Sequence, residues 1–269
     1  MSAAVAWPDG ARSAACLTFD LDADEVWLAE VPNAARRPGV LSQGVYGPNV
    51  AVPLLLEVLG RYGVAATFFV PGRVAERYPE AVRAVLDAGH EVAHHGYTHR
   101  APASLTAQEE EEELARGIAV LRETHGVTVR GYRAPSWDVS VRTVELLQRY
   151  GLAYSSNLMA DFRPYRHTGS DVVELPVHWT LDDAAHFWFG QTAWTRKLAT
   201  NEEAGAIWRA EAAGIDRLGG LCVHTFHPQL IGRPGRLELF EDIVRAVAEA
   251  EGVWAATAAQ VADWVRGGG

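Results

Sequence analysis

Residues 89–99 read Gly-His-Glu-Val-Ala-His-His-Gly-Tyr-Thr-His, an apolar segment that runs directly into histidines. We predict a strand over residues 91–95, which would deliver these side chains at its C-terminal end. His95 and His99 are four residues apart, and on a helical turn this spacing brings two side chains to one face with Cβ atoms roughly 5–6 Å apart. Both imidazoles could then bind one metal ion, whereas in a strand His90 and His94 would be separated by about 13 Å. Taken alone, the pair is also compatible with two loop histidines that bind no metal.

A second apolar segment, residues 14–19, also precedes side chains that can bind a metal. It is followed by Asp20, and Asp22 lies two residues further on. If the backbone is still extended there, the two carboxylates face the same side about 6–7 Å apart. One of them could bind a metal while the other acts as a base beside it. We expect Asp24 and Glu25 to belong to a solvated acidic loop.

Strand-like and helix-like segments alternate along the chain. About seven strand-then-helix units with no long run of either type favour a single parallel α/β domain over residues 1–269. In such folds functional side chains gather at the C-terminal ends of the strands. Polar side chains follow four separate predicted strands, and we expect them to meet at one mouth: Asp20 and Asp22, His95 and His99, Arg133, and His227.

The remaining predicted elements follow from periodicity and from helix and turn signals. Helices are expected at residues 49–62, 79–88, 106–124, 140–150, 202–218, 236–250 and 257–266, and strands at 64–70, 129–132, 153–156, 221–226 and near 253–256. Residues 42–48 contain glycines and are predicted to form part of a long functional loop.

Two further segments have compositions that allow more than one interpretation. Five consecutive glutamates, residues 109–113, lie near the start of the helix predicted after Thr106, where negative charge complements the helix dipole. We interpret them as a solvated helix face. Aromatic residues gather in 186–194, which include Phe187, Trp188, Phe189 and Trp194; they could line a substrate cleft or belong to the core.

The composition limits the classes of partner and the location. A formal net charge of −10 argues against nucleic-acid or anionic-membrane partners, since such a surface repels phosphate. The chain has no apolar run of membrane-spanning length, and its first ten residues lack the pattern of a signal peptide, so we expect a cytoplasmic enzyme. Two cysteines, Cys16 and Cys222, cannot form a disulfide framework, and their apolar surroundings predict buried thiols.

The residues expected at the mouth can be assigned chemical roles. An aspartate and two histidines are one of the ligand sets of catalytic zinc, which leaves a position for water. Such a metal lowers the pKa of its water and polarises a carbonyl oxygen. Asp20 could accept the proton of that water, His227 could protonate a departing amine, and Arg133 would keep Asp20 ionised. This set of side chains predicts hydrolysis of an amide or ester through a tetrahedral intermediate.

The same segments resemble the successive motifs of the polysaccharide deacetylases, carbohydrate esterase family 4. The resemblance extends in order across residues 18–228 through Thr18-Phe19-Asp20-Leu21-Asp22, His95-Gly96-Tyr97-Thr98-His99, Arg133-Ala134-Pro135-Ser136-Trp137 and His227-Pro228. Two additional segments, Ser42-Gln43-Gly44-Val45-Tyr46-Gly47 and Gly232-Arg233-Pro234-Gly235-Arg236, are similar to the branch that contains peptidoglycan deacetylase-like proteins, allantoinases and cyclic imide hydrolases. Leu21 separates two aspartates that are usually adjacent in the commoner form.

This resemblance implies a fold, a cofactor and a set of roles. The fold would be a distorted (β/α)7 barrel, and the cofactor Zn²⁺ or another divalent transition metal such as Co²⁺ or Ni²⁺. Carried over by position, the metal ligands would be Asp22, His95 and His99, the base Asp20, its partner Arg133 and the acid His227. As candidate substrate contacts we name Tyr46, Trp137, Asp161 and Trp179.

We therefore expect a metal-dependent hydrolase that cleaves a C–N bond other than a peptide bond. The leading hypothesis is removal of the N-acetyl group from an amino sugar or from a polysaccharide or peptidoglycan fragment. A cytoplasmic enzyme that opens a cyclic imide or an allantoin-type ureide is the alternative. A hypothesis from another class is a carbohydrate-binding module without turnover. The expected partner is a small-molecule or oligosaccharide substrate, and aromatics near 179–194 could also serve contacts in a homo-oligomer.

Overall fold

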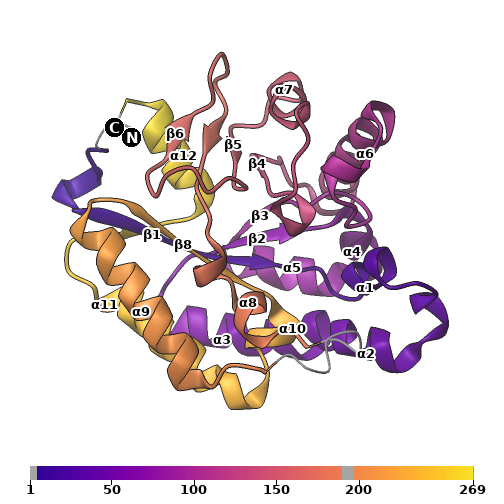
Figure 1. The fold of residues 1–269 in the computed structure, drawn as a ribbon, viewed down its shortest axis with the longest axis horizontal. Coiled ribbons are helices and arrows are strands. Elements are labelled where there is room, and N and C mark those ends of the chain that lie inside the picture. Colours follow the sequence, from indigo (N-terminus) through magenta and orange to yellow (C-terminus); the bar gives the residue numbers. More distant parts are fainter. Residues whose placement is uncertain (1–4, 190–196, 269) are drawn as a thin grey trace.

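A parallel β-sheet with helices around it forms the framework of the protein (Figure 1). The computed structural model describes residues 5–189 and 197–268. Within these residues the strand order is β6-β7-β5-β4-β3-β2-β1-β8, β9 pairs with β1, and only β6 and β7 pair antiparallel. The strands are β1 (Ser13–Asp20), β2 (Thr67–Val70), β3 (Glu91–His94), β4 (Gly131–Tyr132), β5 (Tyr154–Ser155), β6 (Tyr165–Arg166), β7 (Val173–Glu174), β8 (Leu221–Phe226) and β9 (Val253–Ala255).

Strand β1 is the centre of this sheet and is buried along its whole length. One edge pairs with β8, while the other edge pairs with β9 at its start and with β2 at its end. Side chains alternate between two separate hydrophobic clusters: Leu17 and Phe19 pack toward the helices, and Cys16 packs in the other cluster with Phe69 and Tyr154. Alternation thus puts Asp20 on the same face of the strand as Cys16.

The sheet curls, and the segment after β5 bridges to its β8 edge. Leu221 at the start of β8 donates its backbone N–H to the carbonyl of Phe162 over 2.9 Å. Near the other end of β8, Thr225 pairs with Asp182 in an isolated parallel bridge. The prediction of a distorted α/β barrel is therefore confirmed, and the distortion lies at this incompletely paired edge.

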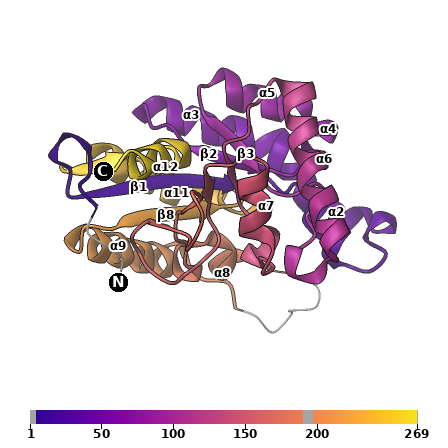
Figure 2. The same ribbon diagram turned by 90° about the horizontal axis from the view of Figure 1, so that it is seen from above.

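Helices surround the sheet on its outer side and close one end of it (Figures 1 and 2). At the start of α12, Ala258 donates its backbone N–H to Thr67, and Ala259 donates to Glu91, so this helix covers the ends where β2 and β3 begin. The opposite end of the sheet is left for the site. The helices are α1 (Glu25–Glu30), α2 (Pro38–Tyr46), α3 (Val52–Tyr62), α4 (Gly72–Arg77), α5 (Pro79–Asp87), α6 (Ala107–His125), α7 (Thr143–Arg149), α8 (Asp183–Phe187), α9 (Asn201–Arg217), α10 (Pro228–Ile231), α11 (Leu237–Glu249) and α12 (Ala258–Arg266).

Most predicted helices are confirmed within a few residues, but residues 42–48 are not a loop. They belong to α2 and to a π-helical turn, Gly47–Ala51. Gly44 allows this helix to lie against the chain near β1, because a Cβ there would be 2.3 Å from the carbonyl oxygen of Ala23. A local sequence pattern does not contain this packing partner.

The predicted solvated loop at Asp24 and Glu25 is also wrong. Both carboxylates are buried and pair with Arg77, at 2.6 Å and 2.9 Å. The prediction of buried thiols at Cys16 and Cys222 is confirmed. None of the described helices combines the length and the apolar composition needed to cross a bilayer. Trp194 lies outside the described residues.

Candidate metal centre

The C-terminal ends of β1, β3 and β8 open into one cavity of about 150 Å³. Its walls carry five of the side chains predicted to converge there. Arg133, which follows β4, is fully buried and contacts the centre from beneath. The five that line the cavity are Asp20, Asp22, His95, His99 and His227.

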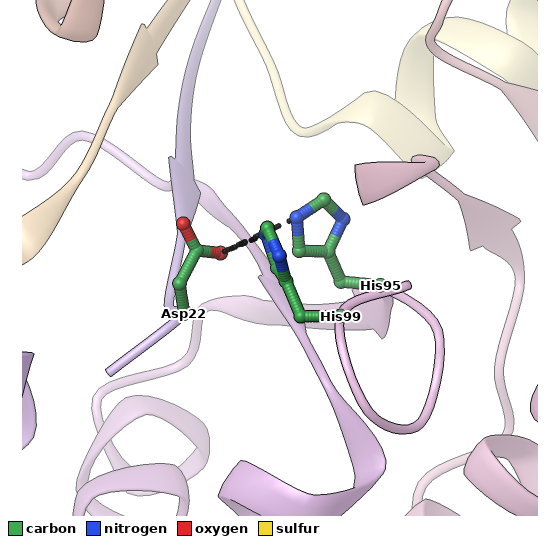
Figure 3. Close-up of side chains that lie close together, drawn as sticks. All are labelled: Asp22, His95 and His99. Atoms are coloured by element: carbon green, nitrogen blue, oxygen red, sulfur yellow. Dashed lines mark ion pairs between the residues drawn. The ribbon is translucent and has the colours of Figure 1, made fainter. Parts of the chain in front are cut away.

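Asp22, His95 and His99 face one another closely enough to hold a single cation (Figure 3). Oδ1 of Asp22 lies 3.3 Å from Nε2 of His95 and 3.4 Å from Nε2 of His99. Around a tetrahedral zinc ion with bonds of about 2 Å, ligand atoms are separated by roughly 3.3 Å. Oδ1 is moreover buried and has no hydrogen-bond partner among the described residues, which is costly unless a cation binds it. The three residues therefore fit a divalent metal.

The ring of His95 is oriented by a backbone hydrogen bond. Its Nδ1 lies 2.7 Å from the carbonyl oxygen of Arg133. Since a carbonyl only accepts, Nδ1 must carry the proton, which leaves the lone pair of Nε2 directed toward Asp22.

His99 reaches the centre from a loop rather than from a helical turn. Residues 95–99 form an irregular bend in which Gly96 and His99 have positive φ angles of 76° and 55°. The predicted pair is thus brought together as expected, although by a different local structure. Burial opposes the charge of His99, but the neighbouring carboxylate of Asp22 outweighs burial and raises the pKa of His99.

Asp20 is placed beside the ligand set and is paired with Arg133. Nη1 of Arg133 donates to Oδ1 of Asp20 over 2.8 Å, and the other oxygen of Asp20 lies 4.0 Å from Nε2 of His95. The guanidinium also donates to Thr18 and Ser156 and lies over the ring of Phe69, so its position is fixed on several sides.

His227 approaches from the opposite side and is held by a residue that the sequence did not indicate. Its Nδ1 lies 2.7 Å from Oδ1 of Asp183, and Nε2 lies 3.6 Å from Oδ2 of Asp22. Burial lowers the pKa of His227, but the carboxylates of Asp183 and Asp182 outweigh burial and raise it well above its ordinary value. His227 is therefore suited to hold a proton on the cavity side.

The solvated helix face predicted for the glutamate tract is wrong at two positions. Glu110 is buried and accepts hydrogen bonds from Ser140 and Thr143. Glu113 accepts from residues 97 and 98 in the loop between the histidines. These glutamates are three residues apart on one face of α6, but Glu109 and Glu112 have the same spacing, so the sequence carries no signal that separates the two pairs.

Aromatic side chains form much of the cavity wall. Trp137 and Trp179 line it with ring centroids 4.3 Å apart, and Trp188 lines it and stacks on Trp27. Two of the four candidate substrate contacts, Trp137 and Trp179, are therefore at the cavity.

The structure does not bring the other two candidates, Tyr46 and Asp161, to this cavity. The hydroxyl of Tyr46 donates to the carbonyl of Gly232, and Asp161 accepts from the backbone of Phe162 and Arg163. Tyr46 is turned toward the end of α10, and Asp161 caps a turn between β5 and β6, so neither lines the cavity.

Comparison with known proteins shows which proteins this chain resembles in sequence and fold. The family model for polysaccharide deacetylase matches residues 46–155. A peptidoglycan deacetylase of Helicobacter pylori is 30% identical over 273 residues, which covers 91% of this chain and 93% of that protein. A crystal structure from Mycobacterium smegmatis, assigned to the polysaccharide deacetylases, is 41% identical with a TM-score of 0.96 and covers 99% of this chain and 94% of that one. PuuE allantoinase shares the fold, with a TM-score of 0.84 at 19% identity over 99% of this chain and 94% of that one.

Proposed function

Because this chain belongs to the polysaccharide deacetylase family, we propose that it is a metal-dependent hydrolase that removes an N-acetyl group from an amino sugar or from a polysaccharide or peptidoglycan fragment. The single observation that carries the proposal is the arrangement around Asp22. Two histidines face its Oδ1, Asp20 lies beside them, and His227 lies on the other side.

The residues divide into a metal site, a base and an acid. Asp22, His95 and His99 would hold the cation, which when bound activates water and polarises the substrate carbonyl. Asp20 would take a proton from the attacking water, and the ion pair with Arg133 holds that carboxylate in place at the cavity.

The acid on the far side would complete the cleavage. His227 carries its proton on the side that faces Asp22, while Asp183 holds the other ring nitrogen. It would protonate the nitrogen that leaves as the C–N bond breaks. Base and acid would thus be separate side chains on opposite sides of the ligand set, so one can accept a proton while the other donates one.

The size of the cavity supports a small reacting group. The cavity has a volume of about 150 Å³. An acetamido group fits such a space, and the rest of an amino sugar would lie across the wall formed by Trp137 and Trp179. Aromatic rings of this kind present flat apolar faces to a sugar ring.

The test is release of acetate. Purified protein loaded with Zn²⁺ or Co²⁺ should release acetate from N-acetylglucosamine oligomers or from peptidoglycan fragments, and the His95→Ala protein should not. If the loaded protein binds metal but releases no acetate from either class of substrate, the proposed substrate is wrong.

The same cavity favours a second candidate, ring opening of a small cyclic imide or ureide. Such a ring is small enough to enter a cavity of about 150 Å³, and the same base and acid would cleave its C–N bond. Loss of the ultraviolet absorbance of a cyclic imide, without acetate release from amino sugars, would select this alternative.

A further inference from the structure

The two proposed histidine ligands differ in how their rings are held. His95 donates from Nδ1 to the carbonyl of Arg133, as ligand histidines commonly do. Nδ1 of His99 is buried and has no hydrogen-bond partner among the described residues. The position of the His99 ring therefore depends on the backbone that carries it.

That backbone is in an unfavourable conformation. His99 has a φ angle of 55°, in the left-handed region, which is sterically unfavourable for a non-glycine residue. Such a conformation persists only where surrounding contacts fix it. The contacts that fix residues 96–98 must therefore also determine where His99 lies.

Glu113 of α6 provides most of these contacts on one side. Its Oε2 accepts the backbone N–H of Tyr97 over 2.9 Å and that of Thr98 over 2.7 Å. Its Oε1 accepts the hydroxyl of Thr98 over 2.5 Å. One carboxylate thus binds three donors from the two residues that precede His99.

Helix α6 is itself fixed against this loop. His94 accepts the N–H of Gly96 at Nδ1, and its Nε2 donates to the carbonyl of Leu114. Gly117, one turn beyond Glu113, allows close approach, because a Cβ there would lie 2.2 Å from Nε2 of His94. The carboxylate is therefore presented from a rigid support and not from a mobile surface side chain.

The other side of the loop is held by the start of α4. The carbonyl of Gly96 accepts from Gly72 over 2.9 Å, and that of Tyr97 accepts from Arg73 over 3.0 Å. These two α4 contacts use backbone groups on both partners, and the Tyr97 hydroxyl also donates to the Glu76 side chain of α4 over 2.9 Å. Glu113 is the side chain that binds the backbone N–H groups of the two residues directly before His99.

We infer that Glu113 is a positioning residue that holds His99 in place for metal binding. Glu113 is absent from the cavity wall and touches neither the ligand atoms nor the space for substrate, so it acts only through the loop. This role rests on the proposed function, because Glu113 can affect catalysis only if His99 binds a metal. The effect of Glu113 on the order of the loop does not depend on a metal.

The inference competes with a simpler account, in which Glu113 serves only the dipole of α6. Glu109 and Glu110 already occupy the first turn of that helix, and Glu109 completes a capping box with Thr106. Glu113 lies beyond that turn, where the interaction with the dipole has declined. Its three hydrogen bonds to the loop remain as its function.

The first measurement is zinc affinity, determined by competition with a chromophoric chelator. Glu113→Ala should weaken zinc binding by about 10–100-fold, as is typical when the partner that orients a ligand is removed. Glu113→Gln keeps an acceptor for the two amides and should lose less than about tenfold. Glu112→Ala, an exposed neighbour on α6 that binds Gln108, is the matched control and should bind zinc like the unmodified protein.

The second measurement is amide hydrogen exchange of residues 96–99 in the zinc-free protein. Exchange should be faster in Glu113→Ala and unchanged in Glu112→Ala. If Glu113→Ala does not fold, Thr98→Val removes the hydroxyl donor alone and should give smaller changes in the same directions.

The outcomes separate this inference from the proposed function. Unchanged zinc affinity in Glu113→Ala, or in Thr98→Val where it replaces that variant, overturns the inference while the hydrolase proposal stands. If the unmodified protein binds no zinc, the proposed function fails. Amide exchange in the zinc-free protein still tests whether Glu113 holds the loop. Unchanged exchange of residues 96–99 in Glu113→Ala would show that it does not.

Discussion

The carbonyl oxygen of Arg133 lies 2.7 Å from Nδ1 of His95, so the residue that pairs with the proposed base also orients a proposed metal ligand. The two contacts use different parts of Arg133: the main chain binds His95, and the guanidinium binds Asp20. Substitution of the side chain should therefore affect the base and leave the orientation of His95 intact. This separation permits metal binding and proton transfer to be tested independently.

Asp20→Asn should abolish most turnover while zinc remains bound. The amide keeps the size of the side chain but cannot accept a proton, and general-base catalysis typically contributes about 10²–10⁴-fold. Zinc affinity should stay within a few-fold, since the ligand set of Asp22, His95 and His99 is unchanged. Steady-state rates and chelator competition measure the two quantities, and retained activity would refute the role of Asp20.

Arg133→Met should destabilise the fold strongly. It leaves the carboxylate of Asp20 buried without its partner, and breaking a buried pair in this way costs about 3–5 kcal/mol. The free energy of unfolding in urea at pH 7 measures the loss. Asp20→Asn in the same chain should recover part of it, because the uncompensated charge is then removed. Arg130→Met, which breaks a surface pair with Asp263, is the control and should cost about 1 kcal/mol or less.

The fold could be predicted where local signals were sufficient. Helices α6, α9 and α12 each begin with a threonine capping box, a signal contained within a few residues of sequence. Helix α2 could not be predicted, because Gly44 there serves contact with Ala23 and not flexibility. Its helical state depends on a packing partner that a local pattern does not reveal.

The site shows the same division between local and long-range information. The convergence of Asp22, His95 and His99 could be predicted because histidines and aspartates follow recognisable strands. Asp183 could not, since its contact with His227 joins residues 44 apart across an irregular segment. Glu113 was misassigned because the composition of the tract suggested solvent exposure, whereas only the fold shows which of its faces meets the loop.

Metal removal should lower the thermal stability of the protein. A ligand that binds only the folded state stabilises it by about 2.7 kcal/mol at a concentration 100-fold above its dissociation constant. The melting temperature should therefore rise on addition of zinc and fall after chelation. His99→Ala should lose this response, and His178→Ala, which changes an exposed histidine, should keep it. A melting temperature in His99→Ala that responds to zinc as in the unmodified protein would contradict the ligand assignment.

Stability should also fall in acid because of His224. This side chain is buried beside Trp208 and Phe226, and burial lowers its pKa from 6.5 to about 4. As the pH falls, His224 takes up a proton in the unfolded chain before it does so in the folded protein. The contribution of neutral His224 to the free energy of unfolding is therefore complete above about pH 6.5 and is lost between about pH 6.5 and pH 4. The loss amounts to about 3 kcal/mol at its limit.

His224→Gln removes the titrating group and tests this contribution. The urea unfolding free energy of the unmodified protein should drop between pH 7 and pH 4.5 by more than that of the variant. His178→Gln is the control, since that histidine is exposed, and it should retain the full pH dependence. Parallel pH profiles for the unmodified protein and His224→Gln would show that His224 is not the source.

Asp183→Asn should impair departure of the leaving group more than metal binding. Asp183 binds Nδ1 and the backbone N–H of His227, so its charge both orients the ring and stabilises the protonated form. Without it, amide hydrolysis should slow by at least about 10²-fold, the usual contribution of a general acid. Hydrolysis of 4-nitrophenyl acetate should slow much less, because nitrophenolate departs without protonation. Zinc affinity serves as the internal control and should change little. Equal losses of rate on the amide and on the ester would show that Asp183 does not act through His227 as the acid.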